Sequence, residues 1–183
     1  MHLIDKALRF AAEAHEGQYR KGTKTPYISH PVAVGMLLLK YGYDEELVAA
    51  GILHDTVEDT EATLEDIEKG FGRTVAEIVA GCSEPDKSLS WEERKEHTIE
   101  FLKTTTNEIR AVACADKLHN ISSIMDDVAQ GGEEVWGRFN RGRDKQEWYY
   151  RNLIDSLGSQ GTFPLLEELK SAVETAFPQG KLF

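Results

Sequence analysis

Cysteine is scarce in this sequence, and long apolar runs are absent. The two cysteines, Cys82 and Cys114, have no CxxC spacing. They do not form a disulfide framework, and they suit a reducing compartment. No stretch approaches the roughly 18 consecutive apolar residues that a membrane-spanning helix needs. The first residues also lack the basic and apolar regions of a secretory signal peptide. We therefore expect a cytoplasmic protein with no membrane partner.

Positive charge is also in short supply. The 183 residues include 21 lysines and arginines against 32 aspartates and glutamates, which gives a formal net charge of −11 at pH 7. Nucleic acids are bound through clustered basic side chains, so this balance argues against a nucleic-acid partner. The same acidic excess favours the binding of a cation. A chain of this length with 40% apolar residues can bury one good core, and we expect a single domain over residues 1–183.

The alternating pattern of a half-buried strand is not found, and no internal repeat of 20–50 residues is present. Apolar residues instead recur at helical spacing. Gly, Pro and capping residues divide the chain into about eight helices. The clearest of these segments are 3–16, 30–40, 73–82, 107–125 and 163–177. The predicted fold class is therefore all-α.

The densest group of polar residues lies directly after an apolar run. His54, Asp55, Glu58 and Asp59 fall within six residues. On a helix, residues four apart share a face, which places His54 above Glu58 and Asp55 above Asp59. Acids next to an apolar core need a compensating charge, and a divalent cation with its bound water would supply one. The alternative is a solvated helix end whose acids face water.

Two further segments carry candidate ligands. His30 precedes Pro31 at the expected start of a helix, where its side chain can face the core. Asp116 lies inside an Ala/Val/Cys run, and a buried aspartate is rare unless it is paired or bound to a metal. Asn120 and Ser123 follow four and seven residues later and share its helical face. A structural ion pair at Asp116 is the alternative.

Two histidines and two aspartates from separate helices can converge on one metal ion. Mixed imidazole and carboxylate ligation suits Mn²⁺, Fe²⁺ or Zn²⁺. Such an ion activates water and polarises a phosphoryl group, so the expected chemistry is hydrolysis of a phosphate ester or anhydride. Glu58 and Asp59 would orient or deprotonate the attacking water. The predicted metal ligands are His30, His54, Asp55 and Asp116.

Basic residues gather in the loop formed by residues 20–24, which contains Arg20 and Lys21. In an acidic chain such a group suggests anion binding, although basic runs are usually only solvated. Positively charged side chains would bind the leaving polyphosphate of a substrate. Besides this loop, the candidates for that role are Lys87, Lys95 and Arg143.

Four motifs occur in order in this chain: Ala14-His15-Glu16-Gly17-Gln18, Pro26-Tyr27-Ile28-Ser29-His30-Pro31, Leu53-His54-Asp55-Thr56-Val57-Glu58-Asp59-Thr60 and Asp116-Lys117-Leu118-His119-Asn120. Together they resemble the motif set of the HD-domain phosphohydrolases and, more narrowly, the hydrolase domain of the RelA/SpoT family of alarmone enzymes, over roughly residues 3–157. A bare His-Asp doublet is weak evidence, but the whole series in order is specific.

The resemblance implies a helical HD-domain fold around a metal site. It also implies (p)ppGpp 3′-pyrophosphohydrolase activity, with Mn²⁺ as cofactor and a nucleotide as the small-molecule partner. The metal ligands and water-activating acids of the family correspond to the residues proposed above for those roles. The family's pair that holds the purine corresponds to Arg20 and Lys21, and its nucleoside contacts correspond to Asn120 and Ser123.

The chain also departs from the long members of the family. Those members continue into a synthetase domain and regulatory domains, whereas this sequence ends at Phe183. We therefore expect it to resemble the small, hydrolase-only alarmone hydrolases such as the metazoan SpoT-like enzymes. The linker between Lys21 and Pro26 is one residue longer than in the long members. The tract 138–145 and the last helix, 163–177, lie outside the motifs, and their roles stay open.

Other functions remain open at the level of sequence. One alternative is an HD-type phosphatase that acts on another nucleotide, such as NADPH or a nucleoside monophosphate. A second is a non-catalytic module that binds the alarmone as a sensor, although such a sensor would not need Glu58 and Asp59 to activate water. A metal-free structural protein is the third. The sequence gives no indication of the oligomeric state.

Overall fold

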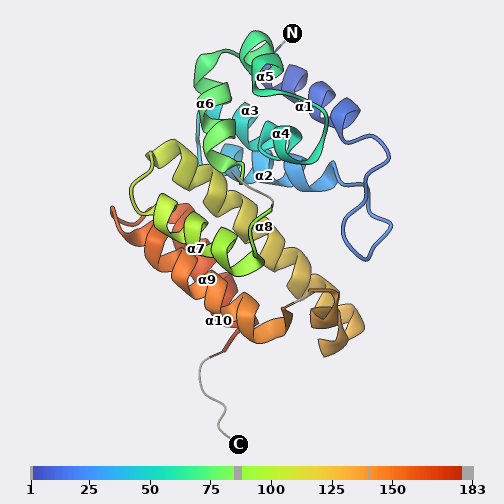
Figure 1. Cartoon of the computed structure of the whole chain (residues 1–183), viewed down its shortest axis with the longest axis vertical. Coiled ribbons are helices and arrows are strands. Elements are labelled where there is room, and N and C mark those ends of the chain that lie inside the picture. The colour runs from blue at the N-terminus through green and yellow to red at the C-terminus, as the bar shows by residue number, and fades with distance from the viewer. Residues whose placement is uncertain (1, 85–87, 140, 179–183) are drawn as a thin grey trace, which may run out of the picture.

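The structure is a computed structural model that describes residues 2–84, 88–139 and 141–178. These residues form ten α-helices and one 3₁₀ helix and contain no β-strand, so the predicted all-α fold is confirmed (Figure 1). In the described part of the chain, no helix combines the length and the apolar character that a membrane crossing requires. In chain order the helices are α1 (Leu3–Ala14), α2 (Ser29–Lys40), α3 (Glu45–Leu53), α4 (Thr56–Asp59), α5 (Leu64–Phe71), α6 (Arg73–Cys82), α7 (Trp91–Leu102), α8 (Asn107–Gly131), η1 (Glu133–Arg138), α9 (Gly142–Gly158) and α10 (Pro164–Ala176).

Helix α8 is the longest element and connects two groups of helices. Helices α1 to α6 lie on one side of it, and α7, α9 and α10 lie on the other (Figure 1). Helix α8 packs against α2, α3 and α6 in the first group and against α10 in the second. Asp116, in the middle of α8, thereby reaches His30 at the start of α2.

Helices α2 and α3 approach each other closely through two glycines. A Cβ atom at Gly35 would lie 2.5 Å from Ile52 Cγ1, and one at Gly51 would lie 2.3 Å from Leu38 Cδ1. Carbon atoms pack best about 3.5–4.0 Å apart, so a larger residue at either glycine would push the helices apart. This packing fixes the C-terminal end of α3, from which His54 projects.

The sequence suggested that the segment around His54 is one continuous helix. The structure instead shows a break there. Helix α3 ends at Leu53, and the four-residue α4 begins at Thr56. The Thr56 hydroxyl donates to Leu53 O at 2.6 Å, and such side-chain bonds compete with the helical hydrogen bonds of the backbone. His54 and Asp55 nevertheless keep right-handed helical backbone angles. Asp59 N therefore still donates to Asp55 O, at 2.9 Å.

Helices α5 and α7 both begin with complete capping boxes. Thr63 and Asp66 exchange side-chain and backbone hydrogen bonds at the start of α5, and Ser90 and Glu93 do so at the start of α7. An N-cap of this kind typically stabilises a protein by about 1 kcal/mol. The cap of α7 fixes where the helix that carries Lys95 begins.

Candidate metal centre and adjoining cavities

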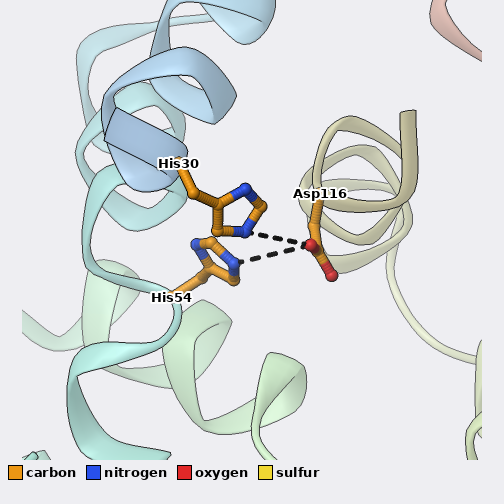
Figure 2. A group of neighbouring side chains, drawn as sticks. All are labelled: His30, His54 and Asp116. Atoms are coloured by element: carbon orange, nitrogen blue, oxygen red, sulfur yellow. Dashed lines mark ion pairs between the residues drawn. The ribbon is translucent and has the colours of Figure 1, made fainter. Parts of the chain in front are cut away.

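Three side chains from separate parts of the fold point toward one another (Figure 2). His30 comes from the first turn of α2, His54 from the junction of α3 and α4, and Asp116 from α8. His30 Nε2 lies 3.2 Å from Asp116 Oδ1, and His54 Nε2 lies 3.9 Å from the same oxygen. One ligand atom from each residue lies within 4.8 Å of the others, so the three form a group that could hold a metal ion.

Asp55 adds a second carboxylate to this cluster. Its Oδ1 lies 3.1 Å from His54 Nε2, and its Oδ2 lies 3.5 Å from His30 Nε2. The side chains of Asp55 and Asp116 are only 18% and 13% exposed. Two such carboxylates side by side need a compensating positive charge. The structure thus brings together the four side chains that the sequence predicts as ligands.

The hydrogen bonds of the two imidazoles fit metal ligation. His54 Nδ1 lies 2.8 Å from Gly51 O. Because a carbonyl oxygen only accepts, Nδ1 carries a proton, and Nε2 can present its lone pair. His54 Nε2 is buried and lies beside the Asp55 and Asp116 carboxylates, at 3.1 and 3.9 Å. His30 Nδ1 is paired with His119 Nδ1 at 2.7 Å. Metal-binding histidines commonly have such a partner on the other ring nitrogen, so these residues fit a divalent metal ion.

The pKa shifts in the cluster describe a place for positive charge. Burial raises the pKa of Asp116, but the charge of Lys117, whose Nζ lies 2.7 Å from Oδ2, and the hydrogen bond with His30 hold it well below its usual value. The pKa of Asp55 is also lowered, against burial, by the charge of His54. Burial lowers the pKa of His54, but the two carboxylates raise it to about 9 overall. A metal ion would replace the proton that these carboxylates favour on His54.

Tyr27 supports the cluster, although it was not among the predicted site residues. Its hydroxyl donates to Asp55 Oδ2 at 2.6 Å and lies 3.4 Å from Asp59 Oδ2. Burial and then the charge of Asp55 raise the pKa of the phenol, which therefore remains a hydrogen-bond donor. Tyr27 belongs to the sequence motif that begins at Pro26. That motif gave no indication of the partner, which is 28 residues away in the chain.

Replacing Tyr27 with Phe is expected to weaken metal binding about 10- to 100-fold, as loss of a partner that orients a metal ligand typically does. The substitution removes only the hydroxyl that orients Asp55. Calorimetric titration of metal into metal-free protein measures the effect. Tyr19→Phe is the control, because Tyr19 is 60% exposed and lies in the same loop. An unchanged affinity in Tyr27→Phe would contradict the supporting role.

The two predicted water-activating acids have different surroundings. Glu58 lines the cavity beside the metal cluster, and its Oε2 accepts a hydrogen bond from Glu84 N at 3.1 Å. Burial raises the pKa of Glu58 despite this hydrogen bond. Asp59 is exposed, and its backbone carbonyl accepts from Gln18 Nε2 at 2.8 Å, which holds the end of α4. Glu58 is thus the acid that faces the metal cluster, and the catalytic roles of both acids stay predictions.

Two adjoining cavities open beside the cluster. The smaller, of about 360 Å³, is lined by the four predicted metal ligands and by Glu58. The larger, of about 530 Å³, lies between the loop after α1, helix α8 and helix α9. A ligand in the larger cavity can reach the metal cluster, because the two cavities share wall residues. These are Arg20, Tyr27, Lys95, Lys117, Asn120 and Tyr149.

Most of the predicted substrate-binding residues line the larger cavity. Arg20 Nη2 donates to Asn120 Oδ1 at 2.7 Å, and Asn120 Nδ2 in turn donates to Asp116 Oδ1. Hydrogen bonds therefore connect the basic loop with the metal cluster. The predicted residues in the cavity wall are Arg20, Lys21, Lys95, Asn120 and Ser123.

Arg143 is not brought to either cavity. Its Nη2 donates to Ala176 O at 3.0 Å, and its guanidinium carbon lies 5.2 Å from the ring centre of Phe177. Arg143 thus connects α9 with the C-terminal end of α10, and its position does not support the predicted contact with a substrate. Lys87 lies outside the described residues, and its role stays a prediction.

Besides Tyr27, the unpredicted residues in the wall of the larger cavity include Lys117, Arg138 and Tyr149. Lys117 follows Asp116 in a motif, but nothing in the motif indicated that its side chain reaches a cavity. Tyr149 is a buried residue of α9, and the sequence analysis gave it no role. Arg138 had a usable signal, because it begins the basic tract 138–145 in an acidic chain. Its Nη1 now lies 2.5 Å from Asp127 Oδ2 at the wall of the larger cavity.

Comparison of the sequence with known protein families identifies the HD domain, the family whose motifs this chain resembles. The family model of the HD domain matches residues 7–145, which is more than half of the chain. The chain belongs to the HD-domain family. This HD-domain protein is 40% identical over 129 residues to a zebrafish (Danio rerio) protein named guanosine-3′,5′-bis(diphosphate) 3′-pyrophosphohydrolase MESH1. The match covers 69% of this chain and 71% of that protein.

The HD-domain chain also resembles a longer bacterial protein and two solved structures. It is 40% identical over 127 residues to the bifunctional (p)ppGpp synthase/hydrolase SpoT of Escherichia coli, but the match covers only 18% of that protein. The structure of a metazoan SpoT ortholog, described as hydrolysing ppGpp, matches with a TM-score of 0.82 at 30% identity over 96% of both chains. The structure of lmo0812 from Listeria monocytogenes matches with a TM-score of 0.76 at 41% identity, over 81% of this chain and 98% of that one.

Proposed function

We propose that this HD-domain protein hydrolyses guanosine 3′,5′-bis(diphosphate), ppGpp, and its 5′-triphosphate form, pppGpp, to GDP or GTP and pyrophosphate. We also propose that it does so in the cytoplasm. The observation that carries the proposal is the continuity between the metal cluster, with Glu58 beside it, and a cavity of about 530 Å³ lined by basic side chains. The names of the zebrafish and metazoan relatives support the choice of substrate.

We propose Mn²⁺ as the metal ion of this site. Mixed imidazole and carboxylate ligands suit Mn²⁺, and also Fe²⁺ and Zn²⁺. A bound divalent ion would activate a water molecule and polarise the phosphoryl group of the substrate. The residues that would hold it are His30, His54, Asp55 and Asp116.

Glu58 is the proposed general base. Its carboxylate takes a proton from the attacking water as the water oxygen bonds to the phosphorus nearest the ribose. The bond between that phosphorus and the 3′ oxygen breaks, and the 3′ oxygen gains a proton, which leaves a free hydroxyl and pyrophosphate. Asp59, the next residue of α4, assists through its proximity to the Tyr27 hydroxyl, at 3.4 Å.

The nucleoside is proposed to occupy the larger cavity. The Arg20 guanidinium, held by Asn120 and packed over Tyr27 at 5.7 Å from the ring centre, offers a flat cationic surface for the purine. Lys21 and Ser123 offer further polar contacts at the same wall. The diphosphate then extends toward the smaller cavity, where the ammonium groups of lysines lie on its path.

The raised pKa of Glu58 predicts the acid side of the pH profile. A general base must be deprotonated, so activity is lost as the pH falls through its pKa. Burial raises that pKa, so the loss is expected at a pH above the ordinary glutamate value of about 4.3. Initial rates of ppGpp hydrolysis measured with saturating metal from about pH 4 to 9 test this. An acid limb at or below about 4.3 would contradict the assignment.

A substrate panel separates the proposal from its alternatives. Purified protein with Mn²⁺ is incubated with equal concentrations of ppGpp, NADPH and GMP, and products are resolved by anion-exchange chromatography. Turnover of ppGpp above the other two is the expected result. If ppGpp is inert while NADPH or GMP is hydrolysed, the protein is a phosphatase of another nucleotide. If ppGpp binds but gives no product over hours, the protein is a binding module.

A further inference from the structure

Glu84, two residues beyond the end of α6, connects Glu58 with basic side chains of α7. The backbone N–H of Glu84 donates to Glu58 Oε2 at 3.1 Å. Its carboxylate accepts from Lys95 Nζ at 2.7 Å and from Arg94 Nη1. The Glu84 side chain is only 13% exposed. These contacts are therefore shielded from water. Ion pairs in such a partly buried place are stronger than ion pairs at the surface.

Lys95 and Arg94 differ in what they face. Lys95 lines both cavities, and its Nζ lies 5.1 Å from the ring centre of Tyr149. Arg94 lines neither cavity. A lysine side chain is flexible and loses rotamer entropy when it is held in one place. The ion pair with Glu84 supplies the favourable interaction that holds the Lys95 ammonium between the two cavities.

The Glu84 carboxylate is ionised in this arrangement. Burial raises its pKa, but the hydrogen bond and charge of Lys95, and then the charge of Arg94, lower it overall. Hydrogen bonds between charged groups are stronger than those between neutral groups. A neutral side chain at position 84 would therefore hold Lys95 less firmly.

We propose that Glu84 is a positioning residue, whose carboxylate fixes the Lys95 ammonium at the junction of the two cavities, where it faces the diphosphate of the substrate. The identity of the substrate rests on the proposed function, whereas the contact between Glu84 and Lys95 does not. The backbone N–H of Glu84 holds Glu58 independently of the Glu84 side chain. A side-chain substitution thus separates the two roles, and Arg94 provides a matched control.

The first test follows the Lys95 ammonium by ¹⁵N NMR, without substrate. In the wild type its Nζ hydrogens are expected to exchange slowly with water, because they are bonded to a shielded carboxylate. Glu84→Gln is expected to abolish this slow exchange, and Arg94→Gln is expected to retain it. Glu84→Asp, which keeps the charge, is expected to restore part of it. An unchanged Lys95 signal in Glu84→Gln would overturn the proposal, whatever substrate the protein hydrolyses.

The second test is a double-mutant cycle in ppGpp hydrolysis. Glu84→Gln is expected to lower kcat about fivefold, the difference between a charged and a neutral hydrogen bond, without raising KM. Lys95→Met is expected to lower kcat and raise KM, because a positive charge leaves the cavity. In the double variant kcat should match that of Lys95→Met within about twofold, since Glu84 acts through Lys95. Effects on kcat that multiply would overturn the proposal.

A failure of the proposed function would look different from a failure of the positioning role. If the wild type does not hydrolyse ppGpp, the proposed function is wrong, and the NMR comparison still decides whether Glu84 fixes Lys95. If ppGpp is hydrolysed but Arg94→Gln lowers kcat as much as Glu84→Gln does, Glu84 does not act through Lys95. Melting temperatures by circular dichroism establish that the variants compared are folded.

Discussion

Replacing Asp116 with Asn is expected to remove the metal ion and to lower kcat by roughly 10³-fold or more. Asp116 Oδ1 lies within 4 Å of both imidazoles, at 3.2 Å from His30 Nε2 and 3.9 Å from His54 Nε2. The substitution keeps the shape of the side chain but removes the charge that attracts a cation. A metal ion supplies several kcal/mol of transition-state stabilisation, and each 1.36 kcal/mol is about a tenfold change in rate.

Metal content per chain after dialysis, together with the rate of ppGpp hydrolysis, measures this effect. Asp155→Asn is the matched control, because Asp155 is exposed on α9 and lines neither cavity. The control is expected to keep both metal and activity. A folded Asp116→Asn protein that still holds stoichiometric metal would contradict the ligand assignment.

Replacing Glu58 with Gln is expected to lower kcat about 10²- to 10⁴-fold, the usual contribution of a general acid or base. In contrast with Asp116→Asn, the metal content should stay unchanged, because Glu58 is not one of the four predicted ligands. The Gln side chain can still accept the hydrogen bond from Glu84 N, so the local structure should be retained. The loss of rate would then come from the lost proton acceptor.

The control for Glu58→Gln is Glu61→Gln, which removes an exposed carboxylate three residues further along the chain. Its rate is expected to match that of the wild type. Single-turnover kinetics with saturating Mn²⁺ separate the chemical step from product release. If Glu58→Gln reacts as fast as the wild type in a single turnover, Glu58 is not the base.

Much of the site could be predicted because it depends on local patterns. The spacing of His54, Asp55, Glu58 and Asp59 is a property of helical geometry, and it survived the break between α3 and α4. A charged residue such as Asp116 within an apolar run indicates a buried and compensated carboxylate. These signals need only a few neighbouring residues. The chemistry of the side chains then suggested that these ligands meet at one metal ion, and the motif series supported the same set.

The remaining features depend on contacts between distant segments. Tyr27 and Asp55 are 28 residues apart, and Arg20 and Asn120 are 100 residues apart. Charge alone could not indicate that Arg143 turns toward the end of α10, whereas Arg138 lies at the cavity wall. Both belong to the same basic tract, and only the packing of η1 and α9 distinguishes them.

Product analysis of ppGpp hydrolysis tests the central claim most directly. The protein is incubated with ppGpp and Mn²⁺, with and without a chelator, and phosphorus NMR identifies the products. The account predicts GDP and pyrophosphate in equal amounts, no product with chelator, and recovery when Mn²⁺ is restored. Release of orthophosphate in place of pyrophosphate, or hydrolysis that continues in the presence of chelator, would contradict it.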